Sequence, residues 1–257
     1  MARVIAILLA WIAAGAATAR AETYRLQYQA EILGVVVLGE ARYEVAASPQ
    51  RYAVRGSLRT SGAARIFDQT QVTATTTGTI SNGAIAWSRY DLSHAYARKF
   101  RRIAMTRANG AVRADIAPPY SDMGAPPATA AQQAVSYDPL TAIFVLGRQI
   151  GTARACRGAV PVFDGRQHFR LSVSPRAQGR FNGGGYNGPA LVCAFRYEPI
   201  AGFSMNPAQR ARIPVAEAWF ALPARPGFAP PLRLTVPTPV GAAQLDLRAY
   251  QSVDASS

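Results

Sequence analysis

The feature that most constrains the fold of this chain is a strict alternation of apolar and polar residues near its start. Between 24 and 32 the even-numbered residues are apolar, Tyr24 and Leu26 among them, whereas Arg25 and Gln27 are polar. A period of two is typical of an antiparallel strand that packs one face on a core and exposes the other to water. Similar segments follow, so the first half of the chain is predicted to be a run of hairpins. The turn signals between them lie at 48–49, 81–83 and 109–110.

The second half of the chain combines one helix with further strands. Residues 118–136 contain four prolines and are predicted to be a long connection. Asp138 can cap the first free N–H groups of a helix and Pro139 suits the first helical position, so an apolar helix is predicted near 139–150. Strand-like segments follow at 160–163, 169–173, 191–197, 216–222, 232–236 and 243–250.

Together these patterns predict a mainly β fold. We expect a single curved antiparallel sheet, a half-barrel or open barrel, with one apolar helix inserted near 139–150. A lone apolar helix among many strands is best placed over the open face of such a sheet. Residues 22–257 are expected to form one β-rich domain, because no repeat or change of composition divides the strands.

The N-terminus has the three parts of a secretory signal peptide. A short basic start precedes an apolar run from 4 to 17, and small residues at Ala19 and Ala21 suit cleavage before Glu22. The run is shorter than the ~20 residues that a membrane-spanning helix needs, so no transmembrane anchor is expected. Residues 1–21 are therefore predicted to be a signal peptide, and the mature chain is predicted to lie in a bacterial periplasm.

The chain is strongly basic, with 28 Lys and Arg against 14 Asp and Glu and a formal net charge of +14. Loss of Arg3 and Arg20 with the signal peptide would lower this charge to +12. Export argues against nucleic acid as the partner. Lys99 is the only lysine, so nearly all of the positive charge comes from arginine. Such a bias favours codon composition as the origin of the arginines. The alternative is that the arginines attract anionic envelope material. The densest basic run is the candidate surface for such a partner: Arg98, Lys99, Arg101 and Arg102.

The two cysteines, Cys156 and Cys193, are predicted to form a structural disulfide, as an even pair does in an oxidising compartment. Neither histidine has metal-ligand spacing to them and Cys-x-x-Cys is absent, so no metal or redox site is expected. Residues 183–188 match a dinucleotide fingerprint, but a strand follows instead of a helix. A hairpin loop is predicted there, and no cofactor.

Residues suited to catalysis are few. His94 and His168 are the only histidines, and no Gly-x-Ser-x-Gly nucleophile elbow is present. His168 falls on the polar side of its predicted strand, next to Arg170, which indicates a solvated side chain. Whether the protein is an enzyme is left open by these residues, although a non-enzymatic role is favoured. A hydrolase with paired carboxylates is the one catalytic class that we retain.

Five segments of the chain form a recognisable set: the strand and bend at 24–34, Asp-Pro-Leu-Thr-Ala at 138–142, Cys156 with Pro-Val-Phe-Asp-Gly-Arg at 161–166, Cys193 with Tyr-Glu-Pro-Ile-Ala-Gly-Phe at 197–203, and Pro-Val-Gly at 239–241. Together these segments resemble a proteobacterial family catalogued as domain of unknown function 3108. The resemblance implies an envelope protein with a signal peptide and no established reaction. Curved sheets with an inserted helix are also similar to periplasmic lipoprotein carriers, whose half-barrels enclose acyl chains.

Three functions follow as hypotheses. The first is a non-enzymatic envelope protein that binds a lipid-like or other hydrophobic component inside the curved sheet. The second is a structural or scaffolding protein that holds anionic envelope polymers through its arginines, and the third is the carboxylate hydrolase. No oligomeric state is predicted. In the first hypothesis, one face of the helix lines the ligand site. The alternative is that the same side chains only fill the core. They are Leu140, Ile143, Phe144 and Leu146.

Overall fold

The computed structural model describes residues 21–66, 69–97 and 99–254. These residues form one sheet of thirteen strands, three short or medium α-helices and a 3-10 helix. The elements are β1 (Glu22–Ile32), β2 (Val36–Ala47), β3 (Arg51–Thr60), η1 (Gly62–Ile66), β4 (Gln71–Ser81), β5 (Ala84–Tyr96), β6 (Lys99–Ala108), β7 (Ala111–Ala117), α1 (Ala130–Val135), α2 (Pro139–Ala153), β8 (Gly158–Phe163), β9 (His168–Gly183), β10 (Tyr186–Ala201), α3 (Pro207–Ala211), β11 (Ala216–Ala221), β12 (Pro231–Thr238) and β13 (Gly241–Asp254).

The sheet is antiparallel throughout, and its strands follow the order β7-β6-β5-β4-β3-β2-β1-β13-β12-β11-β10-β9-β8. The predicted mainly β fold with a single curved sheet is thereby confirmed. Strands β7 and β8 are the two edges, so in the described part of the chain the sheet does not close into a barrel. The first and last strands meet in the middle of this order, with Glu22 opposite Asp254 and Ile32 opposite Ala243.

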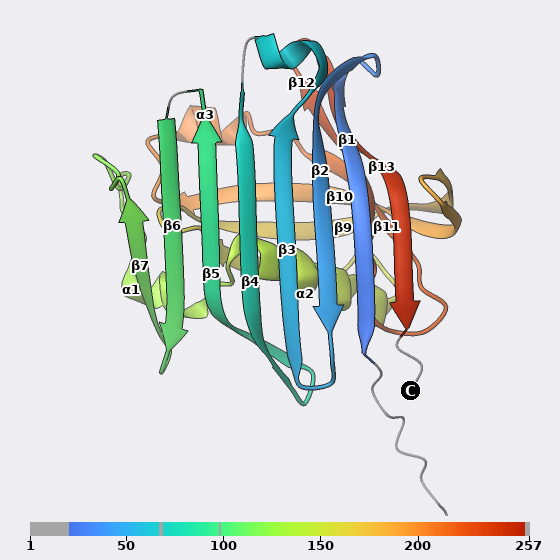
Figure 1. Ribbon diagram of the computed structural model, residues 1–257, viewed down its shortest axis with the longest axis horizontal. Coiled ribbons are helices and arrows are strands. Elements are labelled where there is room, and N and C mark those ends of the chain that lie inside the picture. Colours follow the sequence, from blue (N-terminus) through green and yellow to red (C-terminus); the bar gives the residue numbers. More distant parts are fainter. Residues whose placement is uncertain (1–20, 67–68, 98, 255–257) are drawn as a thin grey trace, which may run out of the picture.

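The sheet folds over so that its two halves face each other (Figure 1). Strands β1 to β7 stand side by side at the front, and the long strands β9 and β10 cross behind them. Helix α2 lies between the two layers and contacts β3, β4 and β8. The predicted position of an apolar helix over the concave face is therefore correct. Sequence patterns missed η1, α1 and α3, since each has only five or six residues and α1 lies within the proline-rich connection at 118–136.

Helix α2 begins where the sequence predicts it. The Asp138 carboxylate caps the free backbone N–H groups of Leu140 and Thr141, and Pro139 occupies the first turn. The helix ends at Ala153, three residues beyond the predicted boundary of 150. A Cβ on Gly151 would lie 2.1 Å from the carbonyl oxygen of Gly227, so only glycine allows the helix to pack so closely on the chain before β12.

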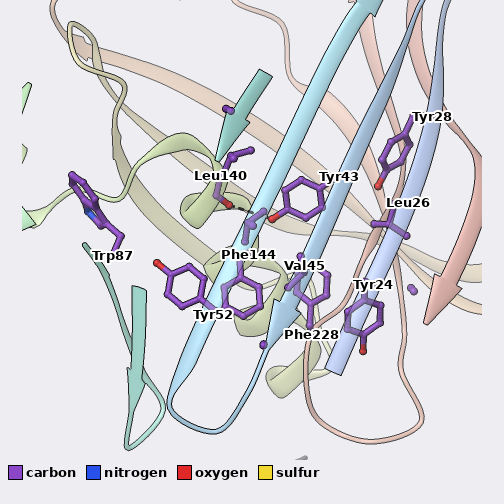
Figure 2. Packing of buried hydrophobic residues seen from close by; sticks show 14 of the residues in the cluster. Tyr24, Leu26, Tyr28, Tyr43, Val45, Tyr52, Trp87, Leu140, Phe144 and Phe228 are labelled. Carbon is purple, nitrogen blue, oxygen red and sulfur yellow. Dashed lines mark hydrogen bonds between the residues drawn. The ribbon is translucent and has the colours of Figure 1, made fainter. Parts of the chain in front are cut away.

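The hydrophobic core surrounds α2 on both sides. Towards the front layer the helix packs on a group of aromatic residues, in which the Phe144 ring lies 5.1 Å from that of Tyr52 and 5.4 Å from that of Phe228 (Figure 2). Towards the back layer it contacts a second cluster, which contains Ile150 and Leu191. The single helix thus joins the two layers of the sheet into one structure.

The two cysteines form the disulfide that the sequence predicts, with their Cα atoms 5.5 Å apart. Cys156 lies just after α2 and Cys193 lies on β10, and both are buried. The bond therefore fastens the C-terminal end of the helix to the back layer. Disulfides are typical of proteins outside the reducing cytoplasm. Residues 1–20 of the predicted signal peptide lie outside the described residues, and none of the described helices is long and apolar enough to cross a membrane.

Candidate apolar binding cavity

A cavity of about 340 Å³ lies between the two layers of the sheet, beside α2. Its front wall consists of side chains from β1 to β5, including Tyr28, Tyr43 and Leu58. Phe195 and Phe220 belong to its back wall, which β10 to β13 supply. Small residues on β2, β3, β4 and β11 leave the space open. They are Ala41, Gly56, Ala74 and Ala218.

Helix α2 forms the floor of the cavity with three of the four residues proposed from the sequence. Leu140, Ile143 and Leu146 line the space, whereas Phe144 does not. Each residue of a helix turns by ~100°, so Phe144 lies well to one side of Ile143 and points into the aromatic core of Figure 2. The assignment of Phe144 to the cavity wall is therefore corrected, and its side chain is part of the core.

The cavity wall offers little polar chemistry. The Tyr28 hydroxyl donates to the carbonyl of Pro231 at 2.7 Å, and the Tyr43 hydroxyl donates to that of Leu140 at 3.2 Å, as the dashed line in Figure 2 shows. Burial raises the pKa of both phenols, so they remain neutral. Arg233, one of two charged residues among those that line the space, pairs with Asp246. The site is suited to an apolar group.

The cavity opens at one end of the sheet, which we call the mouth end. This end carries the turns between β1 and β2, β3 and β4, β5 and β6, and β12 and β13, and it is drawn at the top of Figure 1. Leu58 and Val72 line the cavity close to the β3–β4 connection. Because Leu58 is 41% exposed, the space communicates with solvent there. The opposite end carries the β2–β3, β4–β5 and β6–β7 turns and is called the far end.

A buried polar cluster fixes the start of α2 against the front layer. One carboxylate oxygen of Asp138 accepts the backbone N–H groups of Leu140 and Thr141, each at 3.0 Å. The other accepts the hydroxyls of Thr76 at 2.9 Å and Thr141 at 2.5 Å. The Tyr52 hydroxyl lies 2.9 Å from that of Thr141. Every carboxylate oxygen is thus used to hold the helix, which makes the cluster an anchor for the cavity floor.

The electrostatics of this anchor follow from its burial. Burial raises the pKa of Asp138, and the hydrogen bonds that the carboxylate accepts counteract only part of that effect. Sequence patterns predicted the helix cap but missed Thr76, because it lies on β4 and is 62 residues away from Asp138. The apolar–polar alternation of β4 does not distinguish a buried threonine that binds a partner from a threonine that faces water.

His168 is buried, contrary to the solvated side chain expected from its strand. It is 5% exposed, and its Nδ1 lies 3.0 Å from the Ser136 hydroxyl. That hydroxyl also lies 2.6 Å from the carbonyl of Gln132, to which it donates. The Ser136 hydroxyl is thus held by the end of its own helix as well as by the imidazole. Burial also lowers the pKa of His168, and the pair serves to join α1 to β9.

The basic run proposed as an anionic surface does not form one patch. Arg98 lies outside the described residues. Arg101 lies opposite His94 on β5, stacks on the Tyr120 ring at 3.8 Å and donates to the carbonyl of Pro118. Lys99 and Arg101 therefore share one face of β6, whereas Arg102 has the opposite orientation, because successive strand residues alternate. Among the described residues, no group of three or more His, Cys, Asp or Glu side chains could hold a metal ion.

These features define a class of protein: an open, barrel-like sheet with a helix and an apolar cavity inside it. The chain belongs to the family described as protein of unknown function (DUF3108), whose sequence model matches residues 23–248. Its fold is similar to that of a crystallised β-barrel-like protein of domain of unknown function DUF1849 from Brucella abortus, with a TM-score of 0.54 and 14% identity. That match covers 92% of this chain and 100% of the other. No curated protein matches the sequence.

Proposed function

We propose that this protein binds a lipid-like molecule or another slender apolar compound in the cavity between its two sheet layers. The observation that carries the proposal is the cavity itself, whose lining is mostly apolar and in which the hydroxyls of Tyr28 and Tyr43 already have partners. Its volume of about 340 Å³ falls at the lower end of the range for small-molecule sites. A single acyl chain fits this chemistry better than a bulky or charged compound does.

The proposed setting is the periplasm, after removal of residues 1–21 as a signal peptide. The disulfide between Cys156 and Cys193 supports an oxidising compartment, where lipid-like molecules also need carriers to cross water. Edman degradation or mass spectrometry of the protein from a periplasmic fraction tests this part. A mature chain that starts at Glu22 is the expected result, and an intact Met1 in the cytoplasmic fraction would contradict it.

Saturable binding of a fluorescent fatty-acid probe, together with native mass spectrometry of the purified protein, tests the cavity. Ala41→Trp places an indole inside the space and should abolish probe binding. Ala46→Trp is the matched control, because Ala46 lies on the same strand but five residues away and therefore on the opposite face. Thermal unfolding establishes that both variants are folded, and Ala218→Leu provides a smaller obstruction if Ala41→Trp is unstable.

Two results would overturn the proposal. One is a wild-type protein that carries no apolar molecule and binds no probe. The other is an Ala41→Trp variant that is folded and binds the probe as well as the wild type does. The scaffolding hypothesis has less support, because Lys99 and Arg102 lie on different faces of β6. A carboxylate hydrolase also has less support, since the buried Asp138 is occupied by its four hydrogen bonds.

A further inference from the structure

Exposed apolar side chains of the described residues gather at the mouth end of the sheet. Over the described residues, nine large hydrophobic side chains are exposed. Six of these nine belong to strand ends or turns at the mouth end. Isolated exposed hydrophobic residues are normal on a protein surface, whereas a concentration at one end points to a contact. The six residues are Leu33, Val35, Val36, Leu58, Phe100 and Val240.

Two of the mouth-end turns pack on each other and present one continuous apolar edge. The N–H of Leu33 donates to the carbonyl of Ala242 at 3.0 Å, which links the β1–β2 turn to the start of β13. The Leu33 side chain also covers Gly241, where a Cβ would lie 2.2 Å from the Leu33 Cδ2. We call the exposed residues of these two turns the mouth edge. They are Leu33, Val35, Val36 and Val240.

The mouth edge differs from the turns at the far end of the same sheet. There the β4–β5 and β6–β7 turns use Asn82 and Asn109 at positive φ, each followed by glycine. Asparagine tolerates this conformation and is polar, as suits a turn in water. Leu33 adopts a φ of 57°, where a bulky apolar side chain is uncommon and costs about 1 kcal/mol or more. Val35, two residues later, is 79% exposed. The β1–β2 turn is therefore apolar at positions where these two far-end turns are polar.

The charges near the mouth edge are suited to an anionic partner. Glu31 and Glu40, the acidic residues near this turn, are paired with Arg248 and Arg59. Arg65 on η1, which contacts β2, is exposed and forms no ion pair within the described parts of the chain. Lys99 is likewise exposed and without an ion pair in those parts, at the same end of the sheet but on β6, four strands away from β2. Exposed valines with such cations at the same end of the sheet match the interface of a bilayer, which offers acyl chains beneath anionic head groups.

We propose that the mouth edge docks on the surface of a bilayer that contains anionic phospholipid. In this orientation the opening beside Leu58 faces the membrane, so an apolar ligand can enter or leave the cavity without crossing bulk water. The membrane contact goes beyond the binding of a ligand and can exist without it. Both chain ends of the described structure, at β1 and β13, lie at the far end and do not obstruct the contact.

Vesicle flotation tests the contact with the full mature protein. The vesicles contain phosphatidylethanolamine and phosphatidylglycerol, and a second set contains phosphatidylcholine alone. The test variant carries Val35→Glu and Val240→Glu in the mouth edge. Val253→Glu is the matched control, because Val253 is 54% exposed and lies near the far end. Probe binding by each variant is measured in parallel, since it reports on the cavity independently of the membrane.

We expect the wild type and V253E to float with the anionic vesicles and the double variant to partition about a hundredfold less, since each of the two buried valines contributes about tenfold. Floating with phosphatidylcholine should be weaker. The double variant should still bind the probe, and A41W should still float. No flotation of the wild type, or equal flotation of the double variant, overturns the proposal. A wild-type dimer that V35E/V240E converts to a monomer, with no flotation of either, assigns the edge to a second copy of the chain and also overturns it.

Discussion

Replacing Asp138 by alanine should destabilise the protein by about 3 kcal/mol. The carboxylate caps the backbone N–H groups of Leu140 and Thr141, and losing such a cap costs about 1 to 2 kcal/mol. The hydroxyls of Thr76 and Thr141 also lose a charged acceptor in a buried site, at about 1 kcal/mol each. Release of the carboxylate from its buried position offsets part of this sum. For a chain of this size the melting temperature should fall by about 6–12 °C.

Urea unfolding and calorimetry of the mature protein measure this effect. Thr129→Ala is the matched control, because Thr129 caps α1 with the same geometry but in an exposed, six-residue helix. That variant should lose less than about 1 kcal/mol. A D138A variant as stable as T129A would refute the assignment of Asp138 as the anchor of the cavity floor. Probe binding should weaken in D138A, because Leu140 and Ile143 lie in the first turns of the helix that it holds.

Two further predictions concern the same helix. Burial raises the pKa of Asp138 above its ordinary 3.8, so the stability that its protonated form contributes is present below pH 3.8 and is lost as the pH rises through the folded-state pKa. The side chain of Asp138→Asn cannot ionise, so this variant does not lose that stability. Urea unfolding from pH 3.5 to 7 should therefore show the free energy of unfolding of the variant rising relative to that of the wild type and then levelling off. A difference between the two proteins that stays constant over this pH range would contradict the prediction. Replacing Cys156 and Cys193 together by serine should lower the free energy of unfolding by about 4 kcal/mol. Free thiols in the denatured, unreduced wild type would show that the bond does not form.

Local sequence patterns predict the elements of this fold better than their arrangement. The alternation in β1 and the asparagine-glycine turns at 82–83 and 109–110 are found as predicted, because each depends on a few neighbouring residues. Strand β9 extends to Gly183, far beyond the predicted end at 173. It continues through Pro175 because the pairing with β10 shifts there, and a bulge tolerates a residue that has no N–H to donate.

The candidate site was only partly predictable. An apolar helix over a curved sheet implies that Leu140, Ile143 and Leu146 face the concave side, and they do line the cavity. The burial of His168 depends on α1, a segment distant in sequence whose short helix carries no strong local signal. The contact between Thr76 and Asp138 likewise joins residues that only the folding of the sheet brings together. Such long-range contacts are set by register and packing, which a single sequence does not display.

The pairing of β1 with β13 has a consequence for how the chain can fold. Of the described strands, β13 comes last in the sequence, yet it stands in the middle of the strand order between β1 and β12. Before β13 has paired, the strands form two separate sheets, one from β7 to β1 and one from β12 to β8. The chain then exposes two additional unpaired edges, on β1 and β12. Edges of this kind invite pairing with other chains. An emerging chain therefore remains vulnerable to aggregation until the fourteen residues of β13 are available, and a truncation before Gly241 should yield two incompletely covered half-sheets in place of one protein.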